Sequence, residues 1–128
     1  MLNHDKLISA IFITFSGNCK KALSFYQTCF GGLLYFETFE KELYGYTEMP
    51  VISGSLVSDR IIIHGSDLVH NEGRKLGNYI SIFLHCKNTY DRNELIERLV
   101  FDKKNLSYDN QKLIEVTDAF DVRWILGI

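Results

Sequence analysis

The stretch FSGNCKKALSFYQTCFGG (residues 15–32) contains a complete helix together with its start and stop signals. Gly17 turns the chain, and the side chain of Ser16 or Asn18 is suited to cap the first free backbone N–H groups. Two glycines, residues 31–32, end the helix, the first as a left-handed C-cap. Apolar residues recur at intervals of three and four, which predicts one buried helix face: Ala22, Leu23, Phe25, Tyr26, Cys29 and Phe30.

Strands are predicted on both sides of this helix. LISAIFITF (residues 7–15) is apolar on both faces, which is typical of a central strand. LLYFETFEK (residues 33–41) follows the helix as a second strand. VISGSLVSDRIIIHGSD (residues 51–67) reads as a hairpin that turns at Ser58 and Asp59.

The same order of elements then restarts after a polar linker that contains glycine. YISIFLHC (residues 79–86) is again a strand, and Asn88 or Thr89 can cap the helix that follows. KLIEVTD and VRWILGI close the chain as two strands joined by a short turn. The inward face of the second helix is predicted to consist of Tyr90, Leu95, Ile96, Leu99 and Val100.

This order predicts a single α+β domain over residues 1–128, built from two strand-helix-strand modules. Module one covers about residues 7–68 and module two about residues 77–128, with the split near residues 69–77. Sheets with helices on one side leave the other face free to curl around a ligand. A ferredoxin-like sandwich with a filled core fits the same pattern, so the pattern leaves two architectures open.

Composition excludes several classes of function. The net charge of -2, with lysines and arginines scattered, argues against nucleic-acid binding. No run approaches the roughly 18 apolar residues of a membrane span, so no membrane partner is expected. Three cysteines, without paired spacing or a signal peptide, predict reduced thiols and a cytoplasmic location.

Three segments together resemble the vicinal oxygen chelate superfamily, the glyoxalase, bleomycin-resistance and dioxygenase fold, and within it the PhnB-like branch. The helix stretch of residues 15–32 resembles the branch's first helix, and IIIHGSD resembles its strand that ends in aspartate. VTDAFDVRWIL resembles its closing segment, except that Asp121 replaces a glycine there. The matching residues are Gly17, Asn18, Ala22, Phe25, Tyr26, Phe30, Gly31, Gly32, Asp118, Phe120, Val122 and Trp124.

The resemblance implies two βαβββ-type modules that form a curved mixed sheet around a pocket. Residues 101–111 are short and polar where relatives have a longer aromatic strand, so the second module is expected to be shortened. Some members of the branch carry a methyltransferase label. No glycine motif for a methyl donor is present here, and that activity is not expected.

The resemblance also implies where the metal ligands of the superfamily would stand. These positions fall near Ile11, His64, Tyr79 and Ile125, and Ser53 stands where relatives have a histidine. Isoleucine cannot ligate a cation, and one histidine is not a chelate. We therefore predict no cofactor and no divalent metal.

The predicted pocket is mostly apolar with two or three polar points, and its residues are Ile11, Ile13, Ile62, His64, Tyr79, Ser81 and Ile125. His64 is the candidate catalytic residue, because imidazole can act as acid, base or donor. It can equally be a half-buried histidine bonded to a strand neighbour. Arg123 is either an inward clamp for an anion or a solvated residue opposite Trp124. Asp67 is interpreted as a turn or capping residue.

The functional prediction is a PhnB-like, homodimeric protein that binds a small organic molecule without a metal. Two enzymatic alternatives remain open. One is a metal-dependent glyoxalase or dioxygenase-type enzyme with displaced ligands, and the other is a metal-free enzyme that uses His64. The sequence does not identify the ligand.

Overall fold

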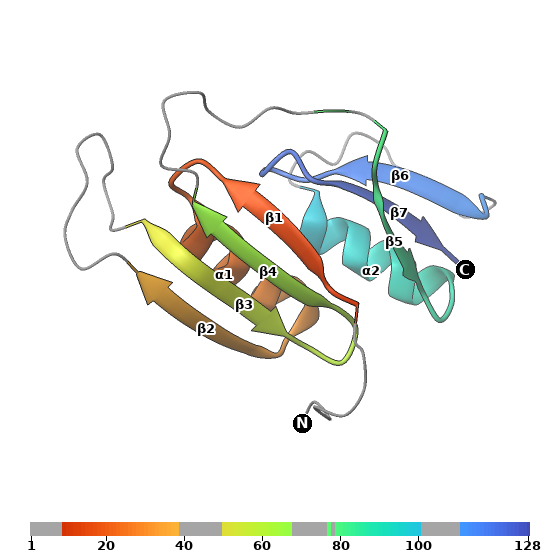
Figure 1. Cartoon of the computed structure of the whole chain (residues 1–128). Coiled ribbons are helices and arrows are strands. Elements are labelled where there is room, and N and C mark those ends of the chain that lie inside the picture. The colour runs from red at the N-terminus through yellow and green to blue at the C-terminus, as the bar shows by residue number, and fades with distance from the viewer. Residues whose placement is uncertain (1–8, 39–49, 68–76, 78, 101–110) are drawn as a thin grey trace. The chain divides into compact units, whose positions relative to one another are not determined.

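The chain divides into two compact units, residues 1–74 and 75–128, each with a helix and a β-sheet (Figure 1). The computed structural model describes residues 9–38, 50–67, 77, 79–100 and 111–128. The architecture is the predicted α+β class, with mixed sheets. A single domain with modules of residues 7–68 and 77–128 stays a prediction. No helix in the described ranges is long and apolar enough to cross a membrane.

The first unit contains a four-stranded sheet in the order β1-β4-β3-β2. β1 runs parallel to β4, and the other neighbouring strands are antiparallel. Its elements are β1 (Ile11–Phe15), α1 (Cys19–Phe30), β2 (Leu33–Thr38), β3 (Val51–Val57) and β4 (Ile62–Asp67).

Helix α1 covers one face of this sheet, as its apolar spacing predicts. Two glycines let the helix approach the two inner strands. A Cβ on Gly65 would lie 3.2 Å from Cys19 Sγ, and a Cβ on Gly54 would lie 2.9 Å from Leu23 Cδ1. The fully buried residues of this core include Phe15, Cys19, Ala22, Leu23, Tyr26, Leu56 and Ile63.

A buried carboxylate from β4 holds the turn that leads into α1. Asp67 Oδ1 accepts the N–H groups of Gly17 (2.8 Å) and Cys19 (2.9 Å), and Oδ2 accepts that of Val51 (2.8 Å). The predicted local cap by Asn18 is wrong, because its side chain makes no capping hydrogen bond. A carboxylate at a helix N-terminus makes stronger, charge-assisted bonds than an amide. Of the two roles considered for Asp67, a turn or a cap, the structure therefore shows the cap.

The end of α1 depends on its two glycines, both of which have a positive φ. Gly31 has φ 73° and Gly32 has φ 99°. The ψ of Gly31 is -165°, so the predicted left-handed helical C-cap at this residue is wrong. A Cβ on Gly32 would lie 2.3 Å from the Val57 carbonyl oxygen, whereas one on Gly31 would meet nothing within 4 Å.

These two glycines make a matched pair for mutation. We expect Gly31→Ala to lower the free energy of unfolding by about 2 kcal/mol, because its φ and ψ lie in a region that almost only glycine occupies, while no clash is added. Gly32→Ala combines a positive φ with a backbone clash and should cost more, roughly 4 kcal/mol. Urea unfolding followed by circular dichroism measures both. Equal losses in the two variants would contradict the close approach of β2 to β3.

The second unit contains β5 (Ile82–His85), α2 (Thr89–Leu99), β6 (Leu113–Thr117) and β7 (Arg123–Gly127). Its described strands are ordered β5-β7-β6, with β5 parallel to β7 and β6 antiparallel to it. The prediction for residues 101–111 falls, except for the last residue, outside the described residues.

Helix α2 starts as predicted but buries a different face. Asn88 Oδ1 accepts the Asp91 N–H at 2.8 Å, which confirms Asn88 as the cap.

Tyr90 on α2 is 72% exposed, so the prediction that it faces inward is wrong. Arg92 is buried instead, and its guanidinium donates to the carbonyl oxygens of Gln111 (2.7 Å) and Lys112 (3.3 Å). These two bonds engage the Nη1 end of the guanidinium, while the aliphatic stem is buried.

The turn between β6 and β7 is also organised by a buried carboxylate. Asp118 Oδ1 accepts the N–H groups of Phe120 (2.8 Å) and Val122 (3.2 Å), and Oδ2 accepts the indole N–H of Trp124 (2.8 Å). Asp121 has φ 64°, a region where glycine is common and aspartate is tolerated. The departure from glycine therefore leaves the turn intact.

Candidate ligand-binding face

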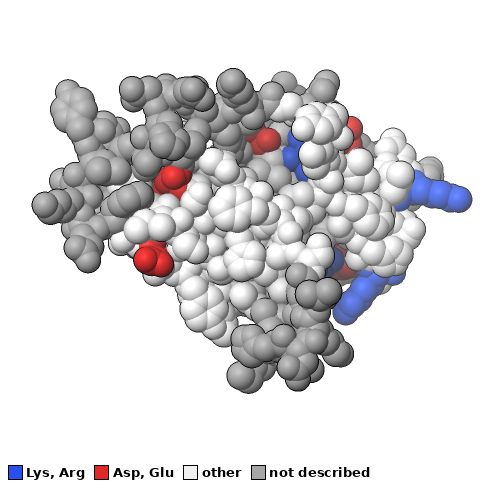
Figure 2. All heavy atoms as spheres, viewed as in Figure 1, with Lys and Arg blue, Asp and Glu red and all other residues white. Residues whose placement is uncertain are grey.

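The side of the first sheet turned away from α1 is the candidate site, and we call it the open face. Alternation along each strand separates its side chains from those that pack on the helix. Strand pairing arranges them in three rows across the sheet. Figure 2 views this side of the unit and shows largely uncharged side chains over its strands, with acidic groups at the end where β2 finishes.

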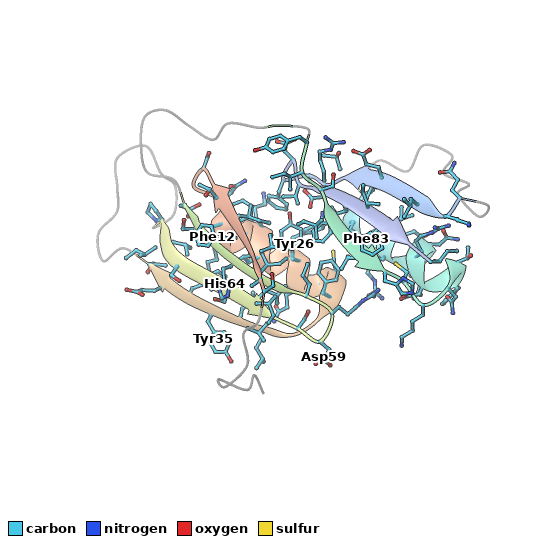
Figure 3. The ribbon with its side chains drawn as sticks, turned by 45° about the vertical axis from the view of Figure 1, so that its right-hand side comes forward. Phe12, Tyr26, Tyr35, Asp59, His64 and Phe83 are labelled. Atoms are coloured by element: carbon cyan, nitrogen blue, oxygen red, sulfur yellow. The ribbon has the colours of Figure 1, made fainter. Side chains whose placement is uncertain are left out.

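The middle row crosses all four strands and consists of Phe12, His64, Ser55 and Tyr35, which are register partners in that order. Phe12 and Tyr35 are 65% and 57% exposed, and Figure 3 shows both with His64 on the same sheet. His64 Nδ1 and Ser55 Oγ lie 2.8 Å apart in a hydrogen bond. The bond orients the imidazole ring, so Nε2 is the ring nitrogen that a ligand on this face would meet.

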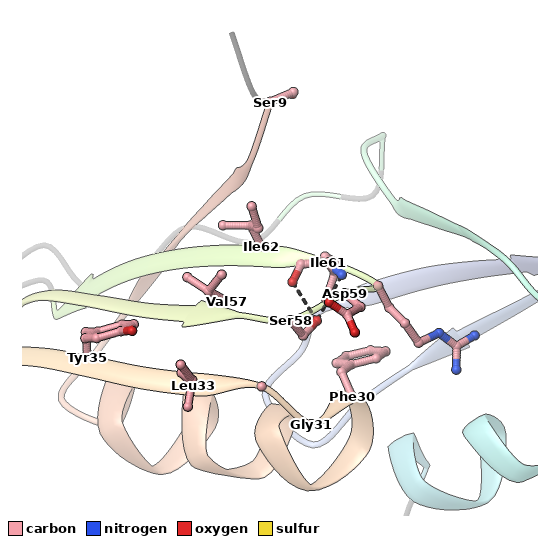
Figure 4. A pocket seen from close by; sticks show the side chains of 12 residues that line it. Ser9, Phe30, Gly31, Leu33, Tyr35, Val57, Ser58, Asp59, Ile61 and Ile62 are labelled. Carbon is pink, nitrogen blue, oxygen red and sulfur yellow. Dashed lines mark hydrogen bonds between the residues drawn. The ribbon is translucent and has the colours of Figure 1, made fainter. Parts of the chain in front are cut away.

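The apolar row consists of Ile62, Val57 and Leu33, beside the β3–β4 turn. Leu33 is 62% exposed. This row and Tyr35 line an open groove of about 1140 Å³ that continues over the turn residues 58–61 and the end of α1 (Figure 4). The turn is closed by a hydrogen bond from Ser58 N–H to the Ile61 carbonyl oxygen (3.1 Å).

The polar row lies at the other end of the strands and consists of Thr14, Ser66, Ser53 and Glu37. Thr14 is paired with Ser66, and Glu37 with Ser53. Glu37 and Ser53 are exposed, and the other two are half-buried. Along the strands, the open face therefore changes from aliphatic through aromatic to hydroxyl-bearing.

The predicted pocket residues of the first unit fall on two different faces. Ile62 and His64 share the open face, as predicted. Ile11 and Ile13 are register partners of Ile63 and the glycine at position 65, and they belong to the side that α1 covers. The structure therefore does not bring them together with His64. Phe12 and Thr14 stand there instead. Alternation grouped Ile11 with Ile13 but could not show which face of β1 packs on α1.

In the second unit, Ile125 and Phe83 are register partners on the face opposite the buried Trp124. Arg123 shares that face and forms an ion pair with Glu115, so it is not a solitary cation.

Two further predicted pocket residues, Tyr79 and Ser81, precede β5. Tyr79 is 87% exposed and Ser81 is half-buried. Ligand binding by these residues stays a prediction.

The side chains at the positions predicted for metal ligands do not fit a divalent metal. Within the described part of the chain, no group of three or more His, Cys, Asp or Glu side chains could hold an ion. The Ile11 and Ile125 side chains have no donor atom, and His64 Nδ1 is already bonded to Ser55.

Cysteine chemistry is equally disfavoured at α1. Burial, and secondarily the negative charge of Asp67, raise the pKa of Cys19 to about 12. The thiol therefore stays protonated at physiological pH and is a poor nucleophile.

Comparison with solved structures identifies the fold of the chain. No protein-family model and no curated protein matches the chain. Among solved structures, PA1353 from Pseudomonas aeruginosa matches with a TM-score of 0.75 and 21% identity, over 95% of this chain and 97% of that one. A putative 3-demethylubiquinone-9 3-methyltransferase, PhnB protein, from Bacillus cereus matches with a TM-score of 0.75 and 18% identity, over 94% and 98%.

A more distant match is a variant of the fosfomycin resistance protein FosX from Listeria monocytogenes, in complex with Mn(II) and 1S,2S-dihydroxypropylphosphonic acid. Its TM-score is 0.63 at 12% identity, over 94% of this chain and 90% of that one. The chain shares the fold of these proteins, and this confirms the predicted glyoxalase-like fold. A PhnB protein is among the structures that share it.

Proposed function

We propose that this is a PhnB-like protein that binds a small organic molecule on the open face of its first unit, without a metal. The observation that carries the proposal is the exposure of Phe12, Leu33 and Tyr35 on a sheet face whose other side is covered by a helix. Large apolar side chains gathered on one exposed surface favour a binding site. FosX, which shares the fold, is a protein whose structure holds a small organic acid.

His64 is proposed to orient the ligand. Ser55 holds one ring nitrogen, which leaves Nε2 to bond a polar group of the ligand. The same arrangement supports a second candidate, a metal-free enzyme in which His64 transfers a proton, because imidazole exchanges protons readily near neutral pH. A metal-dependent enzyme would require ligands other than those described. Stoichiometric, chelator-removable metal in protein purified without chelator would overturn the metal-free proposal.

We expect His64→Ala to weaken binding of 2-naphthalenemethanol, a neutral aromatic probe, by about fivefold, the value of one hydrogen bond. NMR titration of labelled protein measures affinity and reports whether the amide signals of Phe12 and Tyr35 shift. His85→Ala, which removes an exposed histidine of the second unit, is the matched control and should bind normally. Unchanged affinity in His64→Ala would show that His64 does not bind the probe, and failure to fold cooperatively would show that His64 is structural.

We also propose a homodimer in the cytoplasm. β1 and β2 form the two edges of the first sheet, and open edges tend to pair. All three cysteines are buried, a state that suits a reducing compartment. A monomeric mass by light scattering at micromolar concentration would contradict the dimer.

A further inference from the structure

We infer that the open face selects the charge and orientation of its ligand: a neutral or cationic amphiphile, with its apolar body at the apolar row and its hydroxyl or amino group toward the polar row. This inference rests on the proposed small-molecule function and narrows it. It follows from the order of the three rows along the strands and from the sign of the charge at one end.

The rows fix the orientation. Adjacent rows are two residues apart on a strand, or about 7 Å, so the apolar and polar rows are separated by about 14 Å. The apolar row offers no hydrogen-bonding side chain, whereas the polar row offers three hydroxyls and a carboxylate. A polar group left on the aliphatic row would be desolvated without a partner, which is costly. A bicyclic ring with one polar substituent therefore has one favoured orientation.

The charge preference comes from Glu37. It is the one charged side chain in the three rows that define the open face, and it is exposed on β2. The turn at the opposite end carries Asp59 and Arg60, whose formal charges cancel. Glu37 attracts an ammonium group and accepts a hydrogen bond from a hydroxyl group. It repels a carboxylate or a phosphonate. The face is thus unlike a site for the phosphonic acid that one FosX structure holds.

Three probes that share one ring system test this: 2-naphthalenemethanol, 2-naphthylmethylamine and 2-naphthoate. Their affinities for the full-length protein are measured by NMR titration at low and at physiological ionic strength. Relative to the alcohol, we expect the amine to bind about fivefold more tightly and the acid about fivefold more weakly, with both differences shrinking as salt is added. Glu37→Gln should bring the three affinities together, and Glu37→Lys should reverse their order.

Glu97→Gln is the control, because it removes the same charge from an exposed position on α2 and should leave the order unchanged. If the probes bind but Glu37→Lys does not alter their order, the charge inference is wrong and the proposed binding function stands. If no probe binds the wild-type protein, the proposed function itself fails. Tighter binding of naphthoate than of the amine to the wild-type protein would also overturn the inference.

Discussion

Replacing Asp67 with alanine is expected to lower the free energy of unfolding by about 4 kcal/mol or more, enough to prevent stable folding of the first unit. The carboxylate is 8% exposed and accepts three backbone N–H groups, those of Gly17, Cys19 and Val51. Removing it leaves these donors in a buried site, and each unsatisfied donor costs about 1–3 kcal/mol. A typical domain has only about 5–15 kcal/mol to lose.

Urea unfolding followed by circular dichroism measures the effect, and Asp59→Ala in the exposed β3–β4 turn is the control with a change below about 0.5 kcal/mol. Asp67→Asn should lie between the two, because the amide oxygen can still accept while its NH₂ group opposes a backbone N–H. A stable Asp67→Ala protein with an intact α1 would show that the carboxylate does not organise the helix entry.

The second large effect is expected for Trp124→Ala, at about 3–5 kcal/mol. Trp124 is fully buried, and its indole N–H donates to Asp118 Oδ2 at 2.8 Å. Truncation therefore creates a cavity in the buried interior of the second unit and removes one partner of a buried carboxylate. Because Trp124 is the single tryptophan of the chain, unfolding has to be followed by circular dichroism.

Trp124→Phe separates the two contributions. Phenylalanine keeps most of the apolar volume but has no N–H donor, so we expect a loss of about 1–2 kcal/mol. The turn of residues 118–122 should persist in this variant, since Asp118 keeps its bonds to the N–H groups of Phe120 and Val122. Losses of equal size in both variants would assign the whole effect to the hydrogen bond and none to packing.

The sequence alone determined the order of the elements and the two helices, and its family resemblance indicated the fold. The apolar spacing of residues 22–29 and the glycine pair that follows are local signals, and helices are well predicted by such signals. The same holds for the Asn88 cap and for the closing turn at Asp118. His64 and Ile62 were placed on one face by simple alternation.

Only the tertiary structure decided which face of β1 belongs to the site. Ile11, Phe12 and Ile13 are all apolar, so alternation separates two faces without showing which one meets α1. Local sequence patterns also could not reveal two interactions. Asp67 lies 48 residues from the Cys19 N–H that it binds, and the burial of Arg92 depends on carbonyl groups about 20 residues away. Short-range sequence patterns predict the secondary structure that a segment prefers. A distant cap or a buried charge depends instead on groups far away in the sequence, which only folding brings close together.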